Sequence, residues 1–230
     1  MKYITIKILL LAAIMPLFAS CDDHVAIDTS THIGHILCDD HRTLSLEAYK
    51  AQMDSSSSVN AVAVVFALEN EQHGTLAVML DEIPHIAFAD SLMSLGTSCD
   101  VSAYDGYKNS VSMCNTYDSR TGHGSPLGRY VFSSHTFGQS DFIPSCQEAR
   151  LLHSQVYEVN RVIRELQSLG VSADEISTTS AGGACWYWTS TEDASDKNNR
   201  SWLCSMATGG IQQTPKTEHH SARAIVELNY

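Results

Sequence analysis

The sequence predicts a mixed α+β domain, in which helices pack on twisted, mainly antiparallel sheets. Two β-branched apolar segments, residues 59–68 and 75–80, indicate strands near the start of the chain. An amphipathic stretch between Ser145 and Gly170 indicates one long helix in the middle. Aromatic and β-prone segments after residue 185 indicate further strands, so strands flank the helical part on both sides.

The first two predicted strands form a hairpin. Residues 59–68 (VNAVAVVFAL) are apolar on both faces, which favours a central position in a sheet. Residues 69–74 are polar and end in Gly74, and residues 75–80 then return as the second strand.

The long helix has sequence signals at both ends. Ser145 and Glu148 have the spacing of a capping box, and Gly170 stands where a left-handed C-terminal residue belongs. Between these ends, apolar residues recur at spacings of four and three and form one stripe: Leu152, Val156, Val159, Ile163 and Leu166. A shorter helix is expected around residues 109–117.

The C-terminal third is predicted to contain three strands, at residues 186–190, 201–206 and 222–228. Trp186 and Trp188 are two residues apart and therefore share a face, with Tyr187 on the opposite face. We expect Trp188 to lie in the core. Tyr187 is the candidate surface aromatic, which would stack on a sugar ring.

Composition and charge exclude several classes of protein. The 230 residues are 43% hydrophobic, which excludes a wholly disordered chain. Asp and Glu outnumber Lys and Arg by 26 to 14, so nucleic acid is not an expected partner. No P-loop or dinucleotide signature is present, and the Gly-rich segment around Ser125 has the spacing of a turn rather than of a nucleophile elbow. We therefore expect a protein that is not an enzyme.

Residues 1–20 are predicted to be a secretory signal. Lys2 and Lys7 provide the positive region, and the apolar stretch at residues 8–19 is shorter than the about 20 residues that span a bilayer. Loss of this segment removes two positive charges and changes the net charge from −12 to −14.

Small residues run directly into Cys21, and this junction resembles a bacterial lipobox. The resemblance implies that Cys21 is acylated and becomes the mature N-terminus, with an ordinary signal peptide as the alternative. Asp22 and Asp23 resemble the acidic tag that sends some Bacteroidetes-type lipoproteins to the cell surface. The expected organisation is a signal peptide (residues 1–20), a lipidated cysteine and linker (residues 21–31), and one domain (residues 32–230) of an outer-membrane lipoprotein.

Six further cysteines would allow up to three disulfides in an exported domain: Cys38, Cys99, Cys114, Cys146, Cys185 and Cys204. If residues 186–190 and 201–206 pair as an antiparallel hairpin, residue 185 lies opposite about residue 205. A bridge between Cys185 and Cys204 is therefore the expected pairing. In the alternatives, Cys204 is a free thiol in the core or pairs with Cys114.

Several motifs occur in an order that resembles a known family. They are IGHIL (33–37), AVVF (63–66), GTLAV (74–78), DGYKNS (105–110), FIPS (142–145), WTSTE (188–192) and ARAIV (222–226). The series is similar to the family typified by the C-terminal domain of legionella collagen-like proteins, over roughly residues 32–229. This resemblance implies a C-type-lectin-like fold with two helices, twisted sheets and the two termini close together.

The loop that starts at Glu192, the last residue of WTSTE, contains the candidate ligand-binding residues other than Tyr187. They are Glu192, Asp193, Asp196, Asn198 and Asn199, whose oxygen atoms suit calcium. The Glu-Pro-Asn and Gln-Pro-Asp triplets of calcium-dependent lectins are absent, so we expect no cofactor, with calcium as the alternative. We expect no other metal site, because His32 and His35 would point to opposite faces of a strand.

These features favour a surface binding or adhesion module for a glycan or protein ligand, attached to the membrane through its N-terminal lipid. The alternative is a structural subunit or scaffold of a cell-surface assembly with no ligand of its own. The functional expectation comes from analogy between folds.

Overall fold

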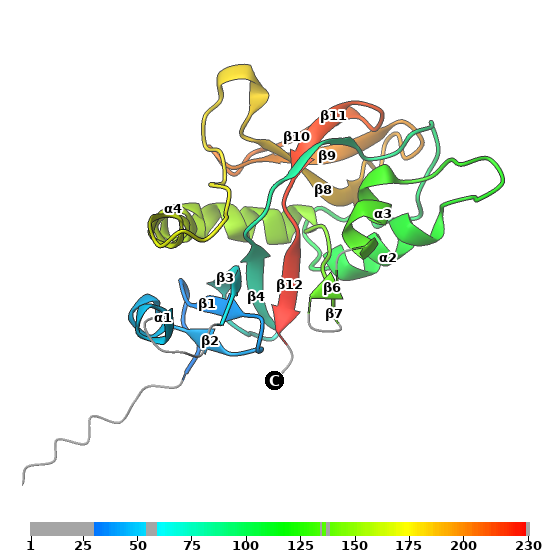
Figure 1. Cartoon of the computed structure of the whole chain (residues 1–230). Helices are drawn as coiled ribbons and strands as arrows, with labels where there is room; N and C mark the ends of the chain where they lie inside the picture. Colours follow the sequence, from blue (N-terminus) through cyan, green and yellow to red (C-terminus); the bar gives the residue numbers. More distant parts are fainter. Residues whose placement is uncertain (1–29, 54–58, 134, 137–138, 229–230) are drawn as a thin grey trace, which may run out of the picture. The chain divides into compact units, whose positions relative to one another are not determined.

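Two five-stranded sheets and four α-helices make up the part of the chain that the structure describes (Figure 1). This computed structural model describes residues 30–53, 59–133, 135–136 and 139–228. Thr31–Tyr230 form one compact unit, to which the following description applies. The predicted mixed α+β class is confirmed.

The first sheet is antiparallel, with the strand order β12-β4-β3-β1-β2. Its strands are β1 (Ile36–Cys38), β2 (Thr43–Leu44), β3 (Ala61–Ala67), β4 (Thr75–Met79) and β12 (Ile225–Leu228). The first and the last strand of the domain therefore belong to the same sheet.

The second sheet has the order β10-β9-β8-β11-β5, and only its β8–β11 pair is parallel. Its strands are β5 (Ile83–Ala87), β8 (Trp186–Glu192), β9 (Arg200–Ser205), β10 (Ile211–Pro215) and β11 (His219–Ala222). A separate short hairpin consists of β6 (His135–Thr136) and β7 (Gln139–Ser140). Sequence patterns had not predicted β5, β10 or β11.

Both predicted hairpins are confirmed. Strands β3 and β4 pair antiparallel, with Val64 opposite Val78. Strands β8 and β9 also pair antiparallel and are joined by the polar loop at residues 193–199. The last predicted strand is shorter than expected, and β12 pairs with β4.

Helix α4 (Cys146–Ser168) confirms the long helix and both of its end signals. Ser145 Oγ accepts a hydrogen bond from Glu148 N (3.3 Å), and Ser145 N donates to Glu148 Oε2 (2.7 Å). At the other end, Gly170 has φ +85°. Its N–H donates to Gln167 O, and Val171 N donates to Leu166 O. This is a Schellman motif, which reverses the chain direction after the helix.

Three shorter helices complete the fold: α1 (Leu46–Met53), α2 (Gly106–Asn115) and α3 (Pro126–Ser133). Helix α2 confirms the expected short helix, although it begins three residues earlier. Helices α1 and α3 were not predicted. The segment interpreted as a turn in fact starts α3, because Ser125 Oγ accepts a hydrogen bond from Gly128 N (2.9 Å) and Pro126 occupies the first helical position.

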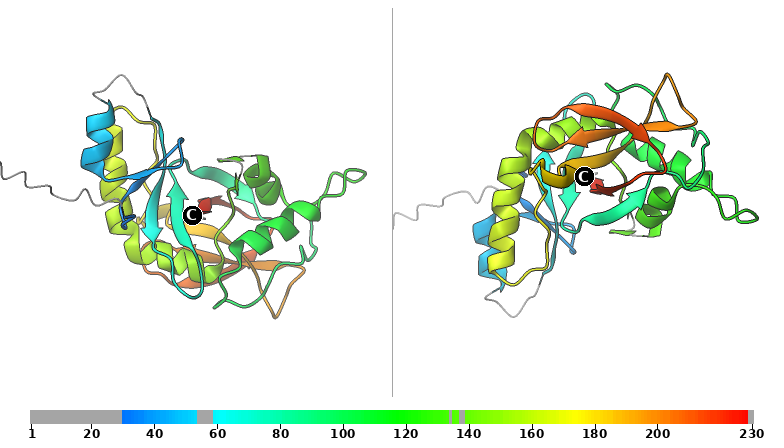
Figure 2. Two further views of the ribbon diagram at one scale, coloured as in Figure 1. Left: turned by 90° about the horizontal axis from the view of Figure 1, so that it is seen from below. Right: turned by 90° about the horizontal axis from the view of Figure 1, so that it is seen from above.

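Strand β8 separates two apolar clusters. Tyr187 packs in the cluster that contains the apolar stripe of α4 and residues of β3 and β4. Trp188 packs in the other cluster with Phe88 and with Met113 of α2. Helix α4 contacts both sheets, and the two views of Figure 2 show it beside the strands of the first sheet. Both faces of β8 are therefore covered.

Candidate functional site

The predicted ligand-binding loop begins at Glu192, whose buried side chain is hydrogen-bonded in the protein interior. Glu192 is fully buried, and its carboxylate accepts hydrogen bonds from Leu95 N (2.7 Å), Ser94 Oγ (3.0 Å) and Thr97 N (3.2 Å). It also forms an ion pair with the fully buried Lys216. Its oxygen atoms therefore bond to the loop at residues 94–97 and to Lys216. The expectation that Glu192 is a ligand-binding residue at the surface is wrong.

Lys216 satisfies its three amine protons within this network. Besides Glu192, Nζ donates to Met93 O (2.8 Å) and to Lys197 O. Burial lowers the pKa of Lys216, and the Glu192 carboxylate opposes that shift. The Glu192–Lys216 pair therefore connects the segment at residues 93–97, the β8–β9 loop and the turn that follows β10.

Three of the remaining loop candidates, Asp193, Asp196 and Asn199, form hydrogen bonds within the loop. Asp193 is 3% exposed, and its carboxylate accepts from both the N–H and the hydroxyl of Ser195 (each 3.0 Å). Asn199 Nδ2 donates to Asp196 Oδ1 (2.7 Å), while Asn198 is exposed. Asp193 is therefore also not an exposed ligand-binding residue. The exposed part of the loop is a hydrogen-bonded turn.

Tyr187 is not a surface aromatic. It is 2% exposed, its hydroxyl donates to Glu82 Oε2 (2.8 Å), and Ser177 N donates to the same hydroxyl oxygen (2.8 Å). Burial and the Glu82 carboxylate raise its pKa. The prediction that Trp188 lies in the core is confirmed, since it is fully buried and its Nε1 donates to Ile86 O (2.8 Å).

The six cysteines of the described region are all unpaired. Tyr187 lies opposite Cys204, and Met206 N donates to Cys185 O, so Cys185 faces Met206 rather than residue 205. Cys185 and Cys204 are thus diagonal neighbours, whose Cα atoms lie about 7–8 Å apart in an antiparallel pair. This exceeds the roughly 4.4–6.8 Å that a disulfide requires, and the structure does not contain the expected bridge.

The buried thiols have little nucleophilic character. Burial raises the pKa of Cys38 and of Cys204 to about 12, and it also raises the pKa of Cys146. A thiol with a raised pKa is protonated at neutral pH, whereas the thiolate is the reactive form.

The expectation that His32 and His35 point to opposite faces of a strand is also wrong. Their rings meet edge to face, with centroids 5.0 Å apart, because His35 N donates to His32 O and closes a turn where a strand was expected. Among the residues described, no group of three or more His, Cys, Asp or Glu side chains is arranged to hold a metal ion. Cys21 and the rest of residues 1–29 lie outside the described residues.

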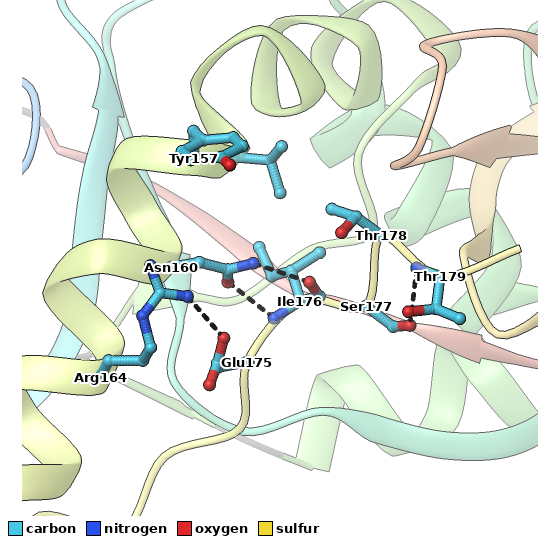
Figure 3. A pocket seen from close by; sticks show the side chains of 9 residues that line it. Tyr157, Asn160, Arg164, Glu175, Ile176, Ser177, Thr178 and Thr179 are labelled. Carbon is cyan, nitrogen blue, oxygen red and sulfur yellow. Dashed lines mark hydrogen bonds and ion pairs between the residues drawn. The ribbon is translucent and has the colours of Figure 1, made fainter.

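A pocket that the sequence did not predict lies between α4 and the segment that follows it. Its volume is about 390 Å³, and Figure 3 shows the side chains that line it. Tyr157 stands on the helix side, whereas Ser177, Thr178 and Thr179 belong to the facing segment. We call this feature the α4 groove; the remaining lining residues are Val156, Asn160, Arg164, Glu175 and Ile176.

The facing segment is fixed to the helix by two paired contacts. Asn160 Nδ2 donates to Ile176 O (2.8 Å), and Ile176 N donates to Asn160 Oδ1 (2.8 Å). Arg164 Nη1 lies 2.7 Å from Glu175 Oε2. Figures 1 and 2 show the chain turning back along α4 after the helix ends, before it enters β8. These contacts hold the two walls of the groove in place.

Tyr157 is the most exposed large hydrophobic residue of the described region, at 87%. It follows Val156 of the apolar stripe by one residue and so projects from the polar side of α4. An aromatic residue off the stripe of a predicted amphipathic helix was the available signal, and the sequence reasoning missed it. The position of residues 175–179 opposite Tyr157 had no local signal.

These features define a groove on the surface of a mixed α+β domain. A scan against known protein families finds no matching family, and no curated protein matches the chain. Within the described residues, no helix combines the length and the apolar character that crossing a bilayer requires.

Proposed function

We propose that this chain is an outer-membrane lipoprotein, anchored through Cys21, that acts as a surface binding module and is not an enzyme. Its C-type-lectin-like domain binds a glycan or protein ligand in the α4 groove. The observation that carries the proposal is Tyr157, which is 87% exposed beside a hollow of about 390 Å³. Small-molecule sites typically combine such a cavity with a few fixed polar groups.

The arrangement of the sheets supports the C-type-lectin-like assignment. Strands β1 and β12, from the two ends of the domain, belong to one sheet, as the family resemblance leads one to expect. The WTSTE segment is the C-terminal part of β8, the middle strand of the second sheet, which lies between two buried clusters.

The anchoring part of the proposal rests on the short apolar stretch that runs into Ser20-Cys21. Replacing Cys21 by Ser should release the protein from the membrane fraction, because no acyl chain can then be attached. A Cys38→Ser variant is the matched control and should stay membrane-bound. If Cys21→Ser is retained in the membrane as the unaltered chain is, the lipoprotein assignment is wrong.

The binding part is tested by screening the full-length protein, in detergent, against glycan arrays and displayed peptides. Tyr157→Ala should abolish the binding that is found. Tyr130→Ala removes a tyrosine that is 46% exposed on α3 and should leave binding unchanged. Binding that survives Tyr157→Ala would place the ligand elsewhere. Capture of envelope proteins without any groove-dependent ligand would favour the scaffold role.

A further inference from the structure

We propose that the α4 groove takes a neutral glycan, with one sugar ring stacked on Tyr157 and its hydroxyl groups bound by the facing segment. This inference rests on the proposed function and narrows its ligand to one chemical class. Four properties of the groove support it: the aromatic surface, the balance of charge, the state of the main chain, and the size.

The aromatic surface is flat and unoccupied by other side chains of the groove. Tyr157 leaves 87% of its surface exposed, so a full ring face is open to a ligand. Val156 and Ile176, at 7% and 1% exposed, form an apolar floor beside it. An aromatic face beside polar groups matches a sugar ring, which presents C–H groups on its faces and hydroxyl groups around its edge.

The charges of the groove balance each other. Arg164 and Glu175 form an ion pair whose side chains are 50% and 43% exposed. A charged ligand would be attracted by one partner and repelled by the other. A neutral diol can bind both without separating them, because one hydroxyl donates to the carboxylate while its neighbour accepts from the guanidinium.

The main chain of the facing segment is bonded at Ile176 and at two of the next three N–H groups. Both polar groups of Ile176 bond to Asn160, Ser177 N donates to Tyr187, and Thr179 N donates to Ser177 Oγ (3.4 Å). A peptide that adds as a strand needs a regular series of free main-chain donors and acceptors, and the bonds made by Ile176, Ser177 N and Thr179 N interrupt such a series. The segment also offers the hydroxyls of Ser177, Thr178 and Thr179, a group that can both donate and accept, as sugar hydroxyls do.

The size of the groove sets the length of glycan that it can hold. A volume of about 390 Å³ lies toward the lower end of the range for small-molecule sites, roughly 300–1,000 Å³. The groove therefore holds a terminal sugar or a short unit of a longer chain. The rest of that chain would extend into solvent.

The test compares neutral glycans, acidic glycans and displayed peptides as probes of the full-length protein, followed by affinity measurement on the hits. We expect neutral glycans to bind and Tyr157→Ala to weaken them at least about tenfold. Tyr157→Phe should retain affinity within about threefold, because the stacking face remains. Raising the salt from about 0.05 M to 1 M should change affinity by less than about threefold, since a neutral ligand has no charge to screen.

The outcomes separate this inference from the proposed function. Hits confined to acidic glycans or to peptides, and lost in Tyr157→Ala, overturn the neutral glycan while the groove remains a binding site. Hits that Tyr157→Ala leaves unchanged, or no hits in any screen, overturn both. The melting temperature of Tyr157→Ala checks its fold and should be unchanged, because the side chain is 87% exposed.

Discussion

Asn160 of α4 bonds both polar main-chain groups of Ile176, which follows it by sixteen residues. Its Nδ2 donates to Ile176 O and its Oδ1 accepts from Ile176 N, each at 2.8 Å. Asn160 and Ile176 are 7% and 1% exposed. This pair of hydrogen bonds holds one wall of the α4 groove against the helix that forms the other wall.

Replacing Asn160 by Ala should destabilise the protein and weaken ligand binding. It leaves the buried N–H and C=O of Ile176 without a partner, at a cost of about 1–3 kcal/mol. Urea denaturation measures the loss, and Asn198→Ala, on an exposed loop, is the control that should have little effect. An unchanged denaturation midpoint in Asn160→Ala would show that these bonds do not hold the segment.

The buried pair of Glu192 and Lys216 leads to a second prediction. Lys216→Met leaves the Glu192 carboxylate charged, buried and without its counter-ion, so it should cost about 3–5 kcal/mol. Adding Glu192→Gln removes the buried charge and keeps a hydrogen-bond acceptor, so the double variant should recover part of that loss. Lys108→Met, on the exposed side of α2, is the control. A double variant no more stable than Lys216→Met would contradict the electrostatic explanation.

Glu148 should make the stability depend on pH. Besides Ser145 N, the main-chain N–H of Gly106 at the start of α2 donates to its carboxylate. Burial outweighs these hydrogen bonds and raises its pKa from 4.5 to about 7. The folded protein thus binds a proton more tightly than the unfolded chain. Its stabilising contribution is complete below pH 4.5 and is lost as the pH rises to about 7.

Glu148→Gln keeps the capping geometry and removes the titration. Relative to the unaltered protein, this variant should gain stability as the pH rises from 4.5 to about 7, by at most about 3 kcal/mol. Denaturation of both proteins across this range measures the difference. Parallel stability curves would mean that Glu148 titrates normally in the folded state.

The apolar stripe of α4 is tested by two alanine substitutions on opposite sides of the helix. Ile163 is fully buried, so Ile163→Ala should cost about 2–5 kcal/mol through lost apolar contact and the cavity left behind. Arg161 is 52% exposed and forms a surface ion pair with Glu158, so Arg161→Ala should cost less than about 1 kcal/mol. Equal losses of unfolding free energy in the two variants would show that the buried face of α4 is assigned wrongly.

Local sequence patterns were sufficient for the elements whose signals lie within a few residues. The capping box at Ser145 and Glu148, the apolar stripe and Gly170 predicted α4, and alternating or β-branched runs predicted the β3–β4 and β8–β9 hairpins. The same patterns did not predict β5, β10 and β11. Strands β10 and β11 are short polar segments, and β5 is interrupted by Pro84 and His85, so all three become strands only through pairing with neighbours.

The candidate site depended on contacts between distant parts of the chain. Periodicity predicted that Tyr187 and Trp188 point to opposite faces of their strand. It could not show that both faces of β8 are covered, because the covering residues come from other elements. Nor could it show that Glu192 pairs with Lys216, or that the chain beyond Gly170 returns to Asn160. The sequence by itself determined the period and the ends of the regular elements. Only the tertiary structure decided which side chains are buried, since burial depends on what packs against each face.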